Sequence, residues 1–144
     1  MKELFDVHCH MVPGVDDGAA DLEESLAMLK MQHEDGVRKI IITPHYRRRM
    51  FETPAKKVHE QFLKLQEAAK KEYPDMSLYL GCELHSNMDL QDILEKRKYV
   101  TMAGSSYVLL EFSEGDSAQH IRERVYNVLS CGYEPIIAHV ERYQ

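Results

Sequence analysis

The sequence has few cysteines and no long apolar run. Its three cysteines, Cys9, Cys82 and Cys131, are too few for a disulfide framework, and their number is odd. None is followed by arginine at the spacing of a Cys-x5-Arg phosphatase loop, so a thiolate mechanism is not encoded. No apolar stretch approaches the roughly 20 residues that cross a bilayer, and the N-terminus lacks a signal-peptide core. These absences predict no membrane insertion and a cytoplasmic location.

The sequence also lacks a basic excess. Lysine and arginine number 18 against 24 acidic residues, which gives a formal net charge of -6. A dedicated nucleic-acid binder needs a positive field, so the charge balance argues against that class, although it leaves room for a local basic patch. No repeat, low-complexity tract or linker divides the chain, and residues 1–144 are expected to form a single domain.

Short apolar runs alternate with longer amphipathic ones. The expected strands span residues 4–10, 38–43, 77–83, 107–112 and 134–139. The expected helices span residues 21–36, 53–69, 89–98 and 117–131. This alternation predicts an α/β fold of parallel βα repeats, with about five strands and helices packed outside. An eight-stranded barrel needs roughly 250 residues, so the chain predicts a small open sheet or an incomplete barrel.

Two helix starts carry capping signals. Asp21 is expected to be an N-cap, with Glu24 completing a capping box. Thr53 is expected to cap the next helix, with Pro54 in its first turn.

Histidine or glutamate stands where each expected strand ends. The side chains concerned are His8, His10, His45, Glu83, Glu111 and His139. The carboxyl ends of parallel strands lie on one rim, where both barrels and open α/β sheets place their sites. We therefore expect these residues to surround one pocket.

The residue types indicate divalent metal ions. His8 and His10 are two apart on a strand, so they face the same way, while Cys9 points to the core. Imidazoles and carboxylates without thiolates suit Mn, Zn or Fe, and several carboxylates allow bridging of two or three ions. The alternative is a set of histidines that are satisfied by ordinary hydrogen bonds.

Loop residues near these ends have two readings each. In Val15–Gly18, one aspartate is either a further ligand or part of a solvated turn. Arg142 and the run Arg47–Arg49 are either ordinary surface residues or cations that grip a phosphoryl group. His85 could be a ligand if it shares a strand face with Glu83.

Several motifs resemble those of the PHP (polymerase and histidinol phosphatase) family. Residues 6–10 with Val15–Gly18 resemble its opening motif, and Thr43–His45 resembles its second. Further segments are similar to the bacterial tyrosine-protein phosphatases of that family, which occur in capsule and exopolysaccharide operons: Met50–Pro54, Gly81–Glu83, Leu110–Phe112 and Ala138–Tyr143.

The resemblance implies a distorted (β/α)7 barrel with a trinuclear site, usually assigned manganese. It implies the metal ligands His8, His10, Asp17, His45, Glu83, Glu111 and His139. It implies Arg142 as the residue that binds the substrate phosphate and its developing charge, with Arg47 and Arg48 as further substrate-binding residues. Members of this branch continue well beyond Gln144 to an Asp-x-His pair, so the chain is expected to be a truncated, N-terminal portion.

The expected activity is metal-dependent hydrolysis of phosphotyrosine in a protein, for instance a tyrosine kinase that regulates capsule or exopolysaccharide synthesis. Clustered ions would lower the pKa of water and supply a hydroxide nucleophile. Two alternatives stay open: a phosphoesterase for a small substrate such as histidinol phosphate, and a non-catalytic family member. An open sheet edge is expected to promote self-association.

Overall fold

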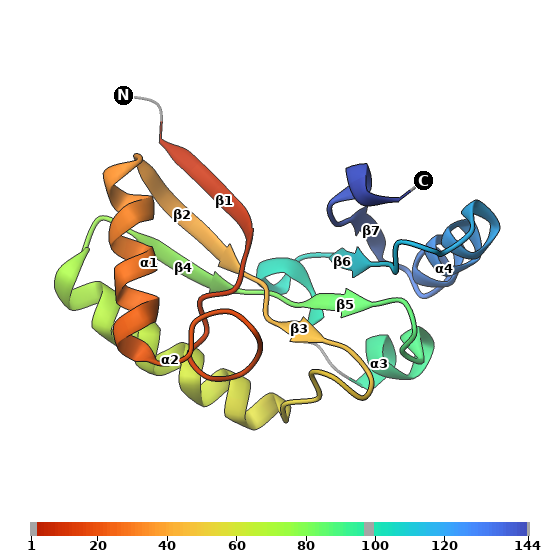
Figure 1. The fold of residues 1–144 in the computed structure, drawn as a ribbon, viewed down its shortest axis with the longest axis horizontal. Coiled ribbons are helices and arrows are strands. Elements are labelled where there is room, and N and C mark those ends of the chain that lie inside the picture. Colours follow the sequence, from red (N-terminus) through yellow and green to blue (C-terminus); the bar gives the residue numbers. More distant parts are fainter. Residues whose placement is uncertain (1–2, 97–99, 144) are drawn as a thin grey trace.

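The strands form two sheets, each made of parallel strands, whereas the sequence predicts a single sheet. The computed structural model describes residues 3–96 and 100–143. One sheet has the order β1-β2-β4 and the other the order β3-β5-β6-β7, and neighbouring strands in each are parallel (Figure 1). The strands are β1 (Leu4–Cys9), β2 (Val37–Ile42), β3 (His45–Tyr46), β4 (Ser77–Leu80), β5 (Glu83–His85), β6 (Tyr107–Glu111) and β7 (Glu134–Ile137). The prediction of a parallel α/β fold is confirmed.

Helices cover each sheet. They are α1 (Leu22–Glu34), α2 (Ala55–Glu72), α3 (Leu90–Lys96) and α4 (Ala118–Ser130), with short 3-10 helices η2 (Met102–Gly104) and η3 (Val140–Arg142). Figure 1 shows α1 and α2 beside the β1-β2-β4 sheet, and α3 and α4 beside the other. Each sheet has its own apolar core with its pair of helices. The expected end of α3 at Lys98 lies outside the described residues.

Two predicted strands, residues 38–43 and 77–83, end earlier than expected. The structure has a break between β2 and β3 and another between β4 and β5. Pro44 has no N–H for a ladder bond, which ends β2. At Gly81 a Cβ would lie 3.0 Å from both Ile41 Cγ2 and Met102 Sδ, so the close approach favours glycine. The backbone N–H of Glu83 donates to Pro44 O at 3.0 Å. The two chain segments therefore stay adjacent, and Glu83 begins a strand, where the sequence predicts that it ends one.

One predicted cap is confirmed and the other is wrong. The Asp21 side chain accepts the Glu24 N–H at 2.9 Å, as an N-cap does. The Glu24 carboxylate accepts the N–H of Ala20 at 2.7 Å, one residue before the N-cap N–H that the predicted capping box uses. Thr53 does not cap α2, whose N-cap position is Pro54. Instead the Thr53 hydroxyl donates to Val15 O at 2.7 Å and ties the start of α2 to the loop after β1.

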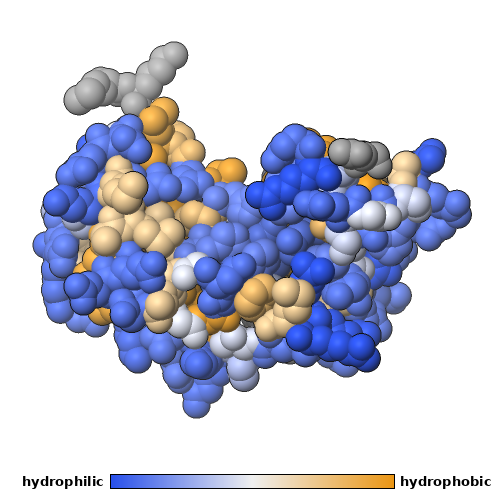
Figure 2. All heavy atoms as spheres, viewed as in Figure 1, coloured by the Kyte–Doolittle hydropathy of each residue, from blue (hydrophilic) through white to orange (hydrophobic). Residues whose placement is uncertain are grey.

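Apolar side chains are exposed along β1, which is an edge strand of its sheet. Leu4, Phe5 and Val7 are 50%, 60% and 54% exposed. Figure 2 shows apolar surface next to the N-terminal end of the chain, where β1 begins. Within the described ranges, no helix combines the length and apolar character needed to cross a membrane.

The exposed apolar edge predicts concentration-dependent self-association, because an unpaired strand with apolar side chains is a template for pairing. We expect Phe5→Lys to lower the weight-average mass in sedimentation equilibrium. The matched control is Leu63→Lys, since Leu63 is also exposed but lies on α2. A wild-type chain that stays monomeric at high concentration would contradict this prediction.

Candidate metal centre

One cavity is lined by the residues that the sequence predicts as metal ligands. Its volume is about 380 Å³. It is lined by His8, His10, Asp17, His45, Arg47, Met50, Phe51, Glu83, Glu111, His139 and Arg142. Arg48 does not line this cavity, although it is the neighbour of Arg47; it lines a different hollow. The structure thus brings together all seven expected ligands and two of the three expected substrate-binding arginines.

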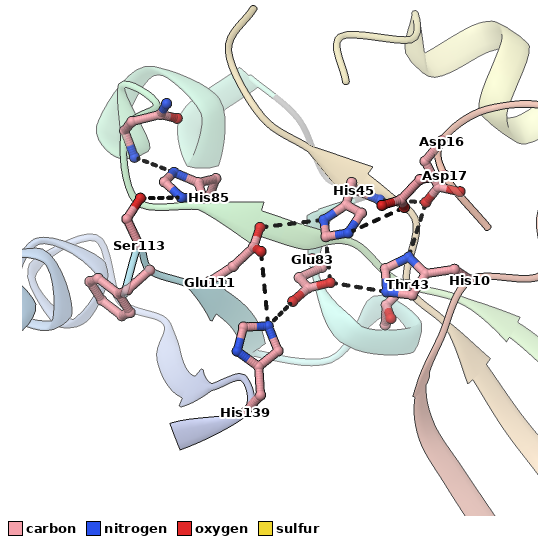
Figure 3. A network of polar contacts seen from close by, with 12 residues as sticks. His10, Asp16, Asp17, Thr43, His45, Glu83, His85, Glu111, Ser113 and His139 are labelled. Carbon is pink, nitrogen blue, oxygen red and sulfur yellow. Dashed lines mark hydrogen bonds and ion pairs between the residues drawn. The ribbon is translucent and has the colours of Figure 1, made fainter. Parts of the chain in front are cut away.

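The carboxylate of Glu83 lies at the centre and is 1% exposed. Its Oε2 is 3.0 Å from His8 Nε2, 3.1 Å from His10 Nε2 and 3.3 Å from His45 Nδ1. Its Oε1 is 2.9 Å from His139 Nε2. His8 lies on β1, His10 follows that strand, His45 lies on β3 and His139 lies in the turn after β7. Figure 3 shows the imidazoles of His10, His45 and His139 around Glu83.

A second carboxylate extends the cluster. Glu111, at the end of β6, places Oε2 3.4 Å from His45 Nδ1 and Oε1 3.9 Å from His139 Nε2. The other ring nitrogen of His45, Nε2, lies 3.6 Å from Asp17 Oδ1. Three overlapping groups have donor atoms within 4.8 Å of one another: His8, His10 and Glu83; His10, Asp17 and His45; His45, Glu83 and Glu111.

The donor atoms fit divalent ions by distance and by chemistry. Two ligand atoms about 2.1 Å from one ion, at angles of about 90–109°, are about 3.0–3.4 Å apart. His45 Nδ1, Glu83 Oε2 and Glu111 Oε2 are buried, and the imidazole and carboxylate atoms 3.0–3.4 Å from them in the described residues are not oriented for a regular hydrogen bond. Buried polar atoms usually have well-oriented partners, so three such atoms side by side fit a site for a cation. The donors are nitrogen and oxygen, which suits Mn, Zn or Fe.

Asp16 positions two of the histidines, a role that the sequence did not assign to it. Its side chain is fully buried, whereas that of Asp17 is 63% exposed. Asp16 Oδ2 lies 3.0 Å from His10 Nδ1 and accepts the backbone N–H of His45 at 2.9 Å, while Oδ1 accepts the N–H of Gly18. A carboxylate on the far ring nitrogen fixes the tautomer and orientation of a ligating histidine. The aspartate–aspartate–glycine turn was the available signal, but it does not say which aspartate turns inward.

The loop after β1 is folded tightly against His10. A Cβ on Gly18 would lie 2.1 Å from His10 O, so only glycine fits. The N–H of Ala19 donates to the same carbonyl at 3.0 Å. The Ser25 hydroxyl of α1 donates to Met11 O at 2.7 Å. These bonds hold His10 in place without any contribution from an ion.

His139 is held in a strained backbone conformation. Its φ of 34° and ψ of 54° lie in the left-handed region, which costs a non-glycine residue roughly 1–2 kcal/mol. The Tyr143 hydroxyl accepts the N–H of Phe112 at 3.0 Å and lies 3.0 Å from His139 Nδ1. The strained turn and Tyr143 together aim the other ring nitrogen at Glu83.

His85, a candidate ligand from the sequence, lies outside the cluster, whereas Phe51 lies in the cavity lining. The ring of His85 turns away from the cavity, accepting the N–H of Asn87 at 3.1 Å and lying 3.3 Å from Ser113 Oγ (Figure 3). The structure does not bring it to the cluster. Phe51 lines the cavity, and its ring stacks on His45 with centroids 5.1 Å apart.

The charges of the cluster shift several pKa values. Burial alone lowers the pKa of His10, but hydrogen bonds with Asp16 and Glu83 outweigh it and raise the pKa to about 10. Burial alone raises the pKa of Glu83, yet hydrogen bonds from His10 and His8 and the charge of His45 hold it far below its usual range. Burial likewise lowers the pKa of His45, and Glu111 and Glu83 raise it overall. The raised pKa values of His10 and His45 mean that the carboxylates favour the protonated form of these two rings.

The fold and this cavity define an α/β protein with parallel strands whose nitrogen and oxygen donors suit divalent metal ions. The chain belongs to the capsular polysaccharide synthesis family CpsB/CapC, whose profile matches residues 4–144. This confirms the branch that the motifs indicate.

Named relatives and a solved structure agree with that membership. The chain is 41% identical over 140 residues to the tyrosine-protein phosphatase CpsB of Streptococcus pneumoniae, covering 97% of this chain and 58% of that protein. It is 30% identical over 139 residues to the tyrosine-protein phosphatase YwqE of Bacillus subtilis strain 168, covering 96% and 55%. The chain therefore spans little more than half the length of these curated relatives.

A solved structure superposes with a TM-score of 0.86 at 30% identity, covering 97% of this chain and 57% of the other. It comes from crystal structures of YwqE from Bacillus subtilis and CpsB from Streptococcus pneumoniae, described as unique metal-dependent tyrosine phosphatases. The likeness confirms the parallel α/β arrangement.

The pKa of His10 predicts how the metal-free chain responds to pH. A histidine whose pKa is raised from 6.5 to about 10 stabilises the fold fully below pH 6.5 and loses that contribution as the pH rises to 10. In EDTA, we expect the melting temperature to fall over this range. The fall should be smaller in His10→Gln than in the control His33→Gln, whose ring pairs with Asp75 on the surface. Equal falls in both variants would contradict the assignment.

Asp16→Asn should weaken binding of Mn²⁺ by about 10–100-fold, because an amide cannot accept from every donor that now meets the carboxylate. Isothermal titration calorimetry measures the affinity. The control is Asp92→Asn, since Asp92 is exposed on α3 and pairs with Lys96. Unchanged affinity in Asp16→Asn would show that the histidines need no such support.

Proposed function

We propose that this chain provides the metal-binding and phosphate-binding residues of a metal-dependent phosphatase that acts on phosphotyrosine in proteins. One observation carries the proposal: four imidazoles and three carboxylates converge on a single cavity whose lining also includes two arginines and Phe51. The names of the relatives, tyrosine-protein phosphatases, support the choice of phosphotyrosine over histidinol phosphate.

The proposed metal ligands are His8, His10, Asp17, His45, Glu83, Glu111 and His139. The three overlapping donor groups support two or three ions, because His10, His45 and Glu83 each belong to two of them. Manganese is the proposed metal, which is consistent with a donor set that holds imidazole and carboxylate but no thiolate.

The proposed architecture is part of a single PHP-type domain, a distorted (β/α)7 barrel. Two features support it. The residues of the cavity come from successive strands and from the turns that follow them, as in barrels. The change in strand pairing after β2 and β4 distorts what would otherwise be one regular sheet.

The chain's own residues would bind and orient the substrate. Bound divalent ions would lower the pKa of water towards neutrality and neutralise phosphoryl charge. Arg142, which lies in the exposed turn after His139, and Arg47 would donate to the phosphoryl oxygens, where charge accumulates during transfer. Phe51 would provide an apolar wall for the aromatic ring of phosphotyrosine. None of these roles needs a phosphoenzyme, in keeping with the buried, inward position of Cys9.

The proposed partner is a protein that carries phosphotyrosine, and a tyrosine kinase of a capsule system fits best. The family's link with capsular polysaccharide synthesis and the relatives' names support this choice. The acidic net charge of the chain does not favour a nucleic-acid substrate.

The test is hydrolysis of p-nitrophenyl phosphate with Mn²⁺ and with EDTA. We expect activity only with the metal, and a loss of about 100-fold in kcat/KM for Arg142→Gln, the size expected when one donor to the transition state is removed. Arg122→Gln is the control, because Arg122 is exposed on α4 and does not line the cavity. Equal activity in EDTA would exclude the metal-dependent mechanism.

A further inference from the structure

A second hollow lies beside the turn that supplies Arg47 to the metal cavity. It has a volume of about 530 Å³, and its lining includes Arg48, Ser86, Asn87, Asp89, His120 and Arg124. These residues come from the turn after β3, the segment after β5 and helix α4. Nothing in the proposed reaction uses the hollow.

The two hollows share structural elements. Arg47 lines the metal cavity and Arg48 lines the second hollow, and Arg47 and Phe51 close the turn through two backbone hydrogen bonds of 2.9 Å. The backbone N–H of Ser86 donates to the carbonyl of Glu111, whose side chain faces the metal cavity. Both hollows therefore border the turn that holds Arg47 and Arg48.

The lining of the second hollow favours an anion. Arg48 is exposed, and Arg124 is half-buried, with Nη2 donating to Met88 O. Arg124 Nε is buried and none of the described residues accepts its N–H. The acidic groups nearby are Asp89, which already caps the amide of Asp92, and Asp116, 3.9 Å from His120 Nε2.

Ser86 adds an independent sign of a ligand. The residue is 1% exposed and it lines the hollow. Its hydroxyl has no hydrogen-bond partner among the described residues. A buried hydroxyl without a partner is costly, and a hydroxyl in a hollow that two arginines also line suits a carboxylate or phosphoryl oxygen.

We propose that this hollow is an accessory anion site, which receives a carboxylate or phosphoryl group of the substrate chain a short distance from the phosphotyrosine in the metal cavity. The inference rests on the proposed function, and it adds a preference for substrates with a second anionic residue. An acidic side chain and a second phosphotyrosine offer the same oxygen chemistry.

The test measures peptide binding to the Mn²⁺-loaded chain by fluorescence anisotropy. The reference peptide carries one non-hydrolysable phosphonate analogue of phosphotyrosine in a neutral sequence. In a first series one glutamate is moved stepwise away from the analogue, and in a second series a further phosphonate analogue takes its place. The two series distinguish an acidic side chain from a second phosphotyrosine.

We expect about fivefold tighter binding at the best spacing, the gain that one partly exposed ion pair gives. Arg48→Gln and Arg124→Gln should each abolish the gain and leave the affinity for the reference peptide unchanged. Arg122→Gln, on the other face of α4, should keep the gain. Arg48 is the decisive position because its exposed side chain can change without loss of the contact that Arg124 makes with Met88.

Two results would overturn the accessory site: no gain at any spacing, or a gain that persists in Arg48→Gln. A reference peptide that fails to bind the Mn²⁺-loaded chain would instead overturn the proposed function itself, and the accessory site with it. The two failures are therefore distinguishable.

Discussion

The burial of one carboxylate, that of Glu83, shapes the site. Moving a carboxylate out of water costs on the order of several kcal/mol, and the cost is offset only by close opposite charge and good hydrogen bonds. Four imidazoles, from three segments that are far apart in the chain, each place a ring nitrogen within 3.3 Å of its oxygens. The same geometry suits cations, because the protons on the imidazoles and metal ions stabilise the same negative charge. Glu83 thus serves as counter-ion in the metal-free chain and as a candidate ligand in the metal-bound one.

The gathering of side chains could be predicted from the sequence because it follows from the geometry of parallel strands. His8, Glu111 and His139 each stand at or near the carboxyl end of a strand, and such ends share a rim. His45 and Glu83 instead begin the short strands β3 and β5. The breaks at Pro44 and Gly81 could not be located in the same way. They depend on which side chains of neighbouring segments approach each other, such as Ile41 and Met102 beside Gly81.

The supporting hydrogen bonds were also beyond the reach of local patterns. Asp16 and Asp17 are chemically alike, and the inward one is selected by the backbone of His45, which lies 29 residues further on. Thr53 has the sequence signature of a helix cap, yet its hydroxyl bonds to Val15 instead. Both bonds fix the loop after β1, so the histidines are oriented without an ion. Such preorganisation lowers the entropic cost of binding.

The left-handed backbone at His139 sets the folding free energy of the chain against the chemistry of the site. Glycine adopts this conformation without penalty, so a sequence optimised for a relaxed backbone alone would carry glycine here. Imidazole at this position gives up some folding free energy in exchange for a nitrogen aimed at Glu83. Stability and chemistry therefore favour different residues at one and the same position, and stabilising replacements there would remove part of the site.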